Sequence, residues 1–363
     1  MRKLWTTVSA SFACGARLTR WTNFRRRSWR PIPTASMVMC AIVVVAVAQN
    51  QSEKTKAQPS HKPPPYWAFT VEPTTDAWDA QAKLPVDDTR RQVPGSAAAF
   101  TLAQIGDYFN APDWHPANHP AMPDIVAGGR KPDVIACGYC HLPNGQGRPE
   151  NSSLAGLSVG YIVQQMAAFK GGLRKSSEPK QRPIGMMIAF ETKANEKEIE
   201  AAAEYFSGLK PIPWIRVVET KTVPKTHVAG WMLVPPDAGG MELIGQRIIE
   251  TPENLEQTEL RNDAFGFIAY VPVGSIKKGK VVVTTGGAGK TIQCAICHGP
   301  DLKGGGDVPS IAGRSPSYVV RQLYDIQSGA RAGVATQSMK VPVAKLAVDD
   351  MVSIAAYTAS LHP

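Results

Sequence analysis

Two pentapeptides in this chain have the residue types and spacing that attach haem. Each reads Cys-x-x-Cys-His: CGYCH at residues 137–141 and CAICH at residues 294–298. This spacing puts two thiols on one turn, where they reach the two vinyl groups of a haem, and it holds the next residue, histidine, beneath the ring to bind iron. We therefore predict two covalently bound haem c groups, attached and ligated by the following residues: Cys137, Cys140, Cys294, Cys297, His141 and His298.

Other uses of paired cysteines fit these residues less well. Cysteine pairs that bind zinc together usually lie about 15 to 20 residues apart, whereas these pairs are far more widely separated and each has its own histidine. A redox-active Cys-x-x-Cys needs no adjacent histidine. Disulfides would leave the repeated histidines and methionines without a role, so haem attachment is the better interpretation.

The pentapeptides lie in an internal repeat with a constant offset of 157 residues, from Cys137 to Cys294. The same offset relates Tyr161, Gln165 and Arg174 to Tyr318, Gln322 and Arg331. The segments YIVQQMAAFKGG and YVVRQLYDIQSG have apolar residues at helical spacing and end at glycine, and a second amphipathic segment closes each copy, at residues 195–209 and 348–361. Two helical domains must therefore position the two histidines.

The repeat also indicates the sixth iron ligands. Met339 lies 18 residues before Tyr357, and the same interval counted back from Tyr205 reaches Met187. A lone methionine is most often a core residue, but here the interval recurs. We predict Met187 and Met339 as ligands, with the neighbouring Met186 as the alternative to Met187.

Each axial histidine needs a partner that fixes its ring. A ligating histidine usually donates its second ring nitrogen to a carbonyl or carboxylate. Pro143 and Pro300 follow the two histidines by two residues. We expect their carbonyl oxygens to orient His141 and His298.

The charge distribution indicates export and excludes nucleic acid as a partner. Of 40 Lys and Arg residues, eight fall within residues 1–48, a stretch that contains no acid, so the rest of the chain is nearly neutral. The basic stretch leads into the apolar run MVMCAIVVVAVA, which ends in Ala-Val-Ala. This pattern is typical of a secretory signal cleaved after Ala48, although retention as an anchor remains open. We expect a periplasmic protein with a possible peripheral membrane association.

The remaining segments complete the predicted organisation. Residues 49–123 form an extended arm, 124–210 a first haem domain, 211–272 an insert and 273–363 a second haem domain. β-Branched and aromatic runs predict short strands at residues 214–218, 267–273 and 281–285. The fold class expected is mainly α, with a short β-containing insert between two similar domains.

At this point the chain resembles tandem class I cytochromes c, the periplasmic dihaem family. The resemblance covers residues 137–210 and 294–363, and rests on the Cys-x-x-Cys-His motifs, the Tyr-x-x-x-Gln helices, the methionines and the closing helices. It implies His/Met ligation and electron shuttling. It also implies that Tyr161, Arg174, Tyr318 and Arg331 border the haem propionates. The arm and the insert depart from the family pattern.

These observations lead to one functional hypothesis and two alternatives. Iron held by histidine and methionine has no open position for substrate, so we expect electron transfer between a donor dehydrogenase and a downstream cytochrome or oxidase rather than catalysis. A dihaem peroxidase is the first alternative, with His115 and His119 as further candidate ligands or acid-base groups. The second is a cytochrome subunit of a membrane dehydrogenase.

Overall fold

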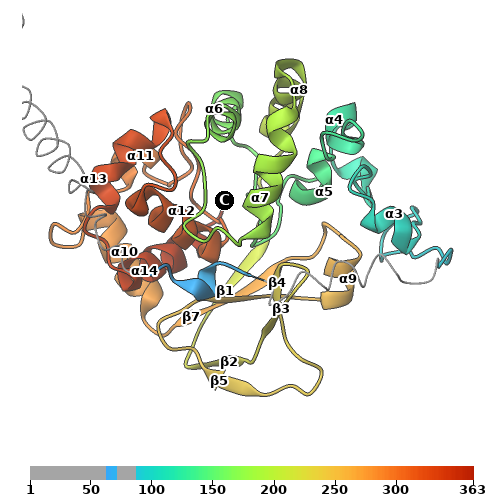
Figure 1. Ribbon diagram of the computed structural model, residues 1–363. Coiled ribbons are helices and arrows are strands. Elements are labelled where there is room, and N and C mark those ends of the chain that lie inside the picture. The colour runs from blue at the N-terminus through green and yellow to red at the C-terminus, as the bar shows by residue number, and fades with distance from the viewer. Residues whose placement is uncertain (1–62, 72–86) are drawn as a thin grey trace, which may run out of the picture. The chain divides into compact units, whose positions relative to one another are not determined.

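The computed structural model describes residues 63–71 and 87–363, and these form a mainly helical protein with small sheets, as predicted (Figure 1). The predicted signal, and most of the arm before residue 87, lie outside the described residues. The described arm contains a 3-10 turn, a short helix and a second 3-10 turn: η2 (Tyr66–Ala68), α3 (Leu102–Gly106) and η3 (Pro116–Asn118).

The first copy of the repeat is built from short helices. In chain order they are α4 (Asp124–Ala127), α5 (Cys137–His141), α6 (Val159–Lys170), α7 (Arg182–Ala189), η4 (Glu191–Lys193) and α8 (Glu196–Gly208). The predicted capping pair at the start of α8 is present, because Asn195 and Glu198 each accept the other's backbone N–H, at 3.0 and 2.7 Å. The apolar face of α8 is buried with that of α6.

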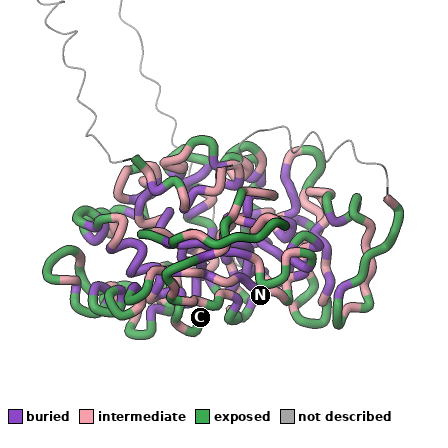
Figure 2. The backbone as a smooth tube through the Cα atoms, turned by 90° about the horizontal axis from the view of Figure 1, so that it is seen from below, coloured by how far each residue is buried: buried purple, intermediate pink, exposed green. Residues whose placement is uncertain are grey.

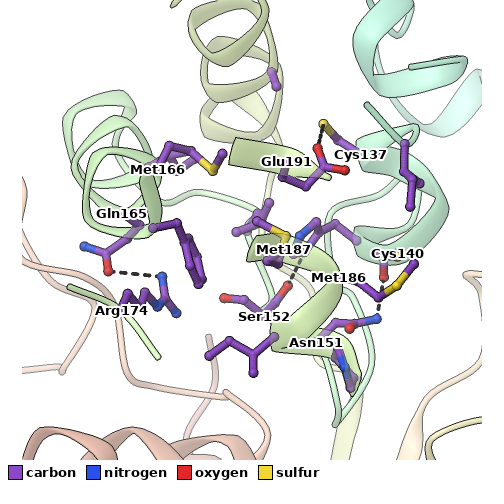
Figure 3. Close-up of a pocket in the computed structure, with 18 of the residues that line it drawn as sticks. Cys137, Cys140, Asn151, Ser152, Gln165, Met166, Arg174, Met186, Met187 and Glu191 are labelled. Atoms are coloured by element: carbon purple, nitrogen blue, oxygen red, sulfur yellow. Dashed lines mark hydrogen bonds between the residues drawn. The ribbon is translucent and has the colours of Figure 1, made fainter. Parts of the chain in front are cut away.

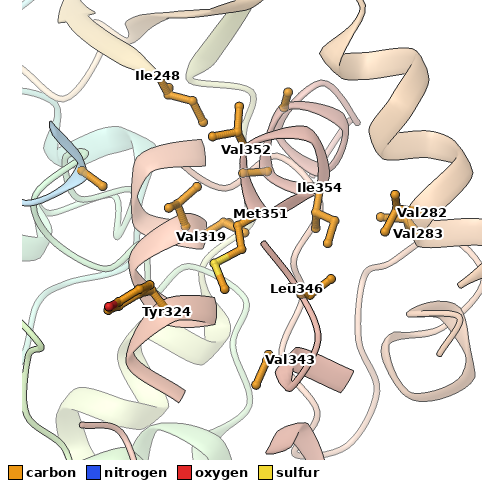
Figure 4. Close-up of a cluster of buried hydrophobic side chains, with 14 of the residues drawn as sticks. Ile248, Val282, Val283, Val319, Tyr324, Val343, Leu346, Met351, Val352 and Ile354 are labelled. Carbon is orange, nitrogen blue, oxygen red and sulfur yellow. The ribbon is translucent and has the colours of Figure 1, made fainter. Parts of the chain in front are cut away.

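The second copy repeats this plan. Its elements are α10 (Ser275–Thr285), α11 (Ala295–His298), α12 (Pro316–Ser328), η5 (Val334–Met339), α13 (Lys340–Val343) and α14 (Val348–Ala359). α12 ends at Gly329, whose left-handed backbone (φ 84°) suits glycine. The hydrophobic core of the second copy contains residues of α10, α12 and α14, and Met351 is fully buried in it (Figure 4).

The strand predicted at residues 281–285 is wrong, because this segment lies in helix α10. The run of three valines there favours β structure locally, but Val282 and Val283 belong to an apolar helical face that packs against α14. Gly279 permits the close approach, since an added Cβ would overlap the carbonyl oxygen of Ser353. Packing therefore overrides the local preference.

The insert holds all seven strands named among the described residues. They are β1 (Ile215–Thr220), β2 (Thr222–Pro224), β3 (His227–Ala229), β4 (Met232–Val234), β5 (Met241–Leu243), β6 (Ile249–Pro252) and β7 (Phe267–Pro272), with helix α9 (Leu255–Glu259) before the last. β7 pairs parallel to β1 and antiparallel to β6, while β2–β5 and β3–β4 are separate antiparallel pairs.

The parallel pair β1–β7 joins the two copies of the repeat. β1 follows α8 of the first copy and β7 leads into α10 of the second, and Ile215 pairs with Phe267 at the start of the register. Figure 2 shows buried segments running through the helical parts, with exposed chain at their periphery. In the described ranges no helix combines the length and apolar character needed to cross a bilayer.

Candidate functional site

The first Cys-x-x-Cys-His turn borders a large cavity. Helix α5 presents the sulfurs of Cys137 and Cys140 to it, and α7 presents Met186 and Met187 from the facing side (Figure 3). The cavity lining is mostly apolar. Two segments that are distant in sequence therefore place two thiols and two thioether sulfurs around one space.

His141 is oriented to bind a metal through Nε2. Its Nδ1–H donates to the carbonyl oxygen of Ser152 at 2.7 Å, and its side chain is buried. Burial lowers the pKa of His141 to about 4, so the ring is neutral and Nε2 keeps its lone pair. A neutral imidazole with one nitrogen fixed by a carbonyl is the form in which histidine ligates iron.

His298 has the same arrangement in the second copy. Its Nδ1–H donates to the carbonyl oxygen of Pro309 at 2.9 Å, and burial lowers its pKa. Ser152 and Pro309 are related by the repeat offset. The expectation that Pro143 and Pro300 would supply these carbonyls is wrong, because each turn is followed by a loop that folds back so that a residue eleven positions on reaches the ring. The Pro143 carbonyl instead accepts from the Tyr205 hydroxyl at 2.7 Å.

The methionines predicted as sixth ligands lie on short helical segments. Met187 and Met186 both line the first cavity and are both partly buried, and Met186 also packs against the cluster that contains Tyr139. Met339 ends η5 and packs against the same core cluster as Cys294. The assignment of Met187 over Met186 therefore stays a prediction.

The repeated tyrosines and arginines form one hydrogen-bond network across the two copies. Arg174 Nη2 donates to the Tyr318 hydroxyl at 3.2 Å, and Arg331 Nη2 donates to the Tyr161 hydroxyl at 2.9 Å. Their backbones meet in an isolated antiparallel bridge between Arg174 and Arg331. Each tyrosine predicted from one copy is thus held by the arginine of the other.

Glutamines of the same repeat complete the network. Arg174 Nη1 donates to Gln165 Oε1 at 3.1 Å, and Arg331 Nη1 donates to Gln322 Oε1 at 2.8 Å. The Nε atoms of both arginines are buried without a hydrogen-bond partner. Such orphaned donors carry a cost unless an acceptor meets them, so they suit the carboxylate of a bound group.

Two acidic side chains at the first cavity escaped prediction. Burial raises the pKa of Glu191 to about 7, and its Oε2 lies 4.0 Å from the Cys137 sulfur. Burial likewise raises the pKa of Glu150 to about 7, although Arg148 lies 3.8 Å away. No motif marks either residue, because their burial depends on how separate segments pack.

His115 and His119, the additional candidate ligands, form hydrogen bonds outside the cavity. His115 Nε2 lies 3.1 Å from Asn262 Oδ1, and His119 Nε2 lies 3.1 Å from Asp113 Oδ1. His119 Nδ1 is also 3.0 Å from the Tyr205 hydroxyl. Neither histidine lines the cavity, so their contacts tie the described part of the arm to the protein body.

The residues present fit a covalently bound haem. Two thiols on one turn, a neutral histidine with its Nε2 available, a methionine sulfur from the facing segment and unpaired arginine N–H groups are the groups that would provide covalent attachment, two axial ligands and partners for propionates. Within residues 63–71 and 87–363, no group of three or more His, Cys, Asp or Glu side chains is arranged so that it could hold a metal ion by itself.

The chain is similar to several bacterial electron-transfer proteins, two of them named as cytochromes. The chain is 24% identical over 247 residues to cytochrome c4 of Azotobacter vinelandii, covering 67% of this chain and 91% of the relative. It is 31% identical over 231 residues to cytochrome c-552 of Acidithiobacillus ferridurans, covering 62% and 73%. It is 34% identical over 237 residues to the thiosulfate dehydrogenase electron acceptor of Stutzerimonas stutzeri, covering 64% and 82%.

The chain was also compared with solved structures and with models of protein families. Among solved structures, the reduced recombinant cytochrome c4 of Pseudomonas stutzeri is similar at 19% identity with a TM-score of 0.40, over 62% of this chain and 93% of that one. No family model matches the sequence.

Proposed function

Because this chain belongs to the dihaem cytochrome c4 family, whose cytochromes carry electrons, we propose that it holds two haem c groups and relays electrons between a donor dehydrogenase and a downstream cytochrome or oxidase. Residues 124–210 and 273–363 would each enclose one haem. The observation that carries the proposal is the matched pair of buried histidines, each with Nδ1 fixed by a carbonyl eleven residues on and Nε2 left for iron.

The proposed ligands explain why the iron would exchange electrons rather than bind substrate. Bound haem supplies reversible one-electron chemistry, and a methionine sixth ligand raises its reduction potential. His141 and Met187 would hold the first iron, and His298 and Met339 the second. The mostly apolar lining of the first cavity would limit the access of water to the first iron, and the carbonyl-bound His141 and His298 would keep their rings in one orientation in both oxidation states.

The network of Arg174, Arg331 and their tyrosines would neutralise haem propionates between the two domains. Its guanidinium groups are buried, and buried cations need anionic or polar partners. Two arginines side by side repel one another, and burial lowers the pKa of Arg174. Propionate carboxylates near the two unpaired Nε atoms would offset that repulsion and join the domains.

The donor and the cellular site are proposed on indirect grounds. One relative is named as the electron acceptor of thiosulfate dehydrogenase, so a dehydrogenase of that kind is the first donor to test. The N-terminal signal pattern favours export to the periplasm. Peripheral association with a membrane dehydrogenase or oxidase is compatible with the same ligand set.

Spectroscopy of the holoprotein tests the proposal. Material matured by a haem-attachment system should be low-spin in both oxidation states, show a methionine-to-iron band near the red end when oxidised, and fail to turn over hydrogen peroxide. High-spin iron with peroxide turnover would contradict the electron-carrier proposal and support the peroxidase alternative. Purified thiosulfate dehydrogenase mixed with the oxidised protein then tests the donor, since reduction by thiosulfate should require both proteins.

A further inference from the structure

The Cys-x-x-Cys-His turn of the first copy, residues 137–141, is here called the first haem turn, and residues 294–298 are the second haem turn. The first haem turn is covered by segments that lie outside the repeat. The middle of the turn is Tyr139, which is only 4% exposed. Its ring packs edge-on against Tyr108 of the arm at 4.8 Å between centroids, and the Arg261 guanidinium of the insert lies 3.6 Å from its centroid. Arg261 also donates to the Tyr139 carbonyl oxygen at 2.8 Å. The arm and the insert thus close this face of the first turn.

The covering segment of the insert, residues 258–263, is anchored along its length. Arg148 donates to the Thr258 carbonyl at 2.5 Å, and Asn144 donates to the Asp263 carbonyl at 2.8 Å. Trp114 of the arm donates to the Leu260 carbonyl at 2.8 Å. Both Asn144 and Arg148 lie on the loop just after His141, so the cover is bound to the loop that follows the haem turn.

The second haem turn is open at the matching position. Ile296, which the repeat offset relates to Tyr139, is 69% exposed, and the sulfur-bearing Cys297 is exposed where Cys140 is partly buried. Ile292, just before the turn, is also exposed. Because a thioether bond would fix a haem edge to its cysteine sulfur, an edge joined to Cys297 would lie near the surface, close in sequence to the exposed Ile292 and Ile296.

Basic residues are frequent in the two segments that contain this open turn and Met339. Residues 276–300, which contain the turn, and residues 328–347, which contain Met339, carry no Asp or Glu, and one exposed acid, Asp301, follows the turn. Their exposed basic residues are Lys277, Lys278, Lys280, Lys290, Lys340 and Lys345. Lys278 and Lys290 are paired with Asp349 and Asp350 of α14, whereas the exposed Lys340 and Lys345 form no ion pair with any residue that the structure describes. An apolar centre with a basic rim complements a partner with an apolar contact and carboxylates around it.

We propose that redox partners with an acidic face dock on the second turn, around Ile296, and that the first haem exchanges electrons only with the second. This inference rests on the proposed electron-carrier function. Each encounter transfers one electron, which oxidises the carrier by one equivalent and reduces the partner by one. The first haem then acts as an internal store that refills the exposed one.

Stopped-flow oxidation of the reduced holoprotein tests the docking face. The acceptors are oxidised plastocyanin, a copper protein with an acidic patch, and tris(phenanthroline)cobalt(III), a cationic complex. Ile296→Glu and Lys345→Glu should each slow the reaction with plastocyanin by about tenfold, because they place a carboxylate against the acidic partner. The same variants should react with the cobalt complex at least as fast as the parent protein.

Matched controls place the same charges elsewhere. Leu243→Glu changes an apolar side chain that is 75% exposed in the insert, and Lys221→Glu reverses an exposed charge there. Both should leave the two rates within about twofold of the parent, since steering acts through the local field near the docking face. Equal slowing by control and test variants would overturn the proposal, because it would show an effect of net charge alone.

Carbodiimide cross-linking gives a readout independent of rates. Mixed with plastocyanin, the holoprotein should form amide links at Lys340 or Lys345, and these should disappear above about 0.3 M salt as charges are screened. Links confined to the insert or to the first repeat would overturn the proposal. If the reduced protein reacts with neither acceptor, the electron-carrier proposal is contradicted. If it reacts with both and Ile296→Glu leaves the rate with plastocyanin unchanged, the electron-carrier proposal stands and only the proposed docking face is contradicted.

Discussion

The two haem turns share their chemistry and differ in their surroundings. Both present two cysteines and a carbonyl-bound histidine, yet Tyr139 in the first turn is covered by Arg261 and Tyr108 while Ile296 in the second is exposed. The covering residues belong to the arm and the insert, which do not repeat. The repeat therefore sets what each turn can bind, and the unrepeated segments set what can reach it.

A second difference lies inside the two sites. Glu191 lies five residues before α8 and is buried beside Cys137, whereas the residue five positions before α14 is Val343, packed in an apolar core. The buried carboxyl beside Cys137 thus has an apolar side chain as its counterpart in the second copy, which gives the two sites different electrostatics. We expect the first haem alone to respond to pH near neutrality.

Removing the sulfur ligands should have the largest effect. Met187→Ala and Met339→Ala each take the sixth ligand from one iron, so each should remove about half of the red-end band and lower one potential by roughly 100 mV or more. Redox titration followed by absorbance measures both. Met186→Ala is the matched control, and loss of the band in that variant with its retention in Met187→Ala would reverse the ligand assignment.

The second-largest effect is expected from breaking the arginine–tyrosine–glutamine network between the two copies. Arg331→Ala removes the arginine donor to the Tyr161 hydroxyl and to Gln322, and one of the two donors to Gln165, so we expect a loss of about 2 to 4 kcal/mol in the free energy of unfolding. Urea unfolding of the holoprotein measures it. Arg174→Ala should cost a similar amount, and Arg216→Ala, which removes an exposed ion pair with Glu253, less than about 1 kcal/mol. Equal costs for all three would refute the network's role.

Removing a contact that covers the first haem turn should have a moderate effect on local stability there. Arg261→Ala removes a stacked guanidinium and a hydrogen bond to the Tyr139 carbonyl, which together stabilise the cover by about 1 to 2 kcal/mol. Amide hydrogen exchange in residues 137–141 should become about tenfold faster, while residues 294–298 stay unchanged. Arg247→Ala, a contact within the insert, serves as control. Unchanged exchange in residues 137–141 would show that Arg261 does not hold the cover.

The smallest expected effect is a pH dependence of the first haem. Burial raises the pKa of Glu191 to about 7. Above that pH the ionised carboxyl stabilises the more positive ferric state, so the potential of the first haem should fall as pH rises through 7, by at most about 59 mV per unit for one proton and one electron. Glu191→Gln should flatten this slope. A slope that survives in Glu191→Gln would assign the proton to another group, with Glu150 the next to test.

The sequence alone was sufficient for the parts that repeat. The short turns that carry the Cys-x-x-Cys-His motifs, the helices that end at glycine and the cap formed by Asn195 follow from local spacing, because turn formation, helix termination and capping act over a few residues. The strands near residues 215 and 267 followed from local composition as well. These predictions needed no knowledge of distant contacts.

The parts that failed depend on packing between distant segments. The valines of α10 favour a strand until α14 covers them. The carbonyl partners of His141 and His298 are set by loops that fold back eleven residues. The burial of Tyr139 and Glu191 depends on the arm, the insert and η4, none of which carries a motif, so tertiary structure was needed to see it.

The intact mass of the matured protein tests the central claim most directly. The account predicts a mass increased by two haem groups, with one lost in a variant that replaces Cys137 and Cys140 by alanine and the other lost in a variant that replaces Cys294 and Cys297. A mature protein without added haem, or a single haem shared by the two pairs, would contradict it.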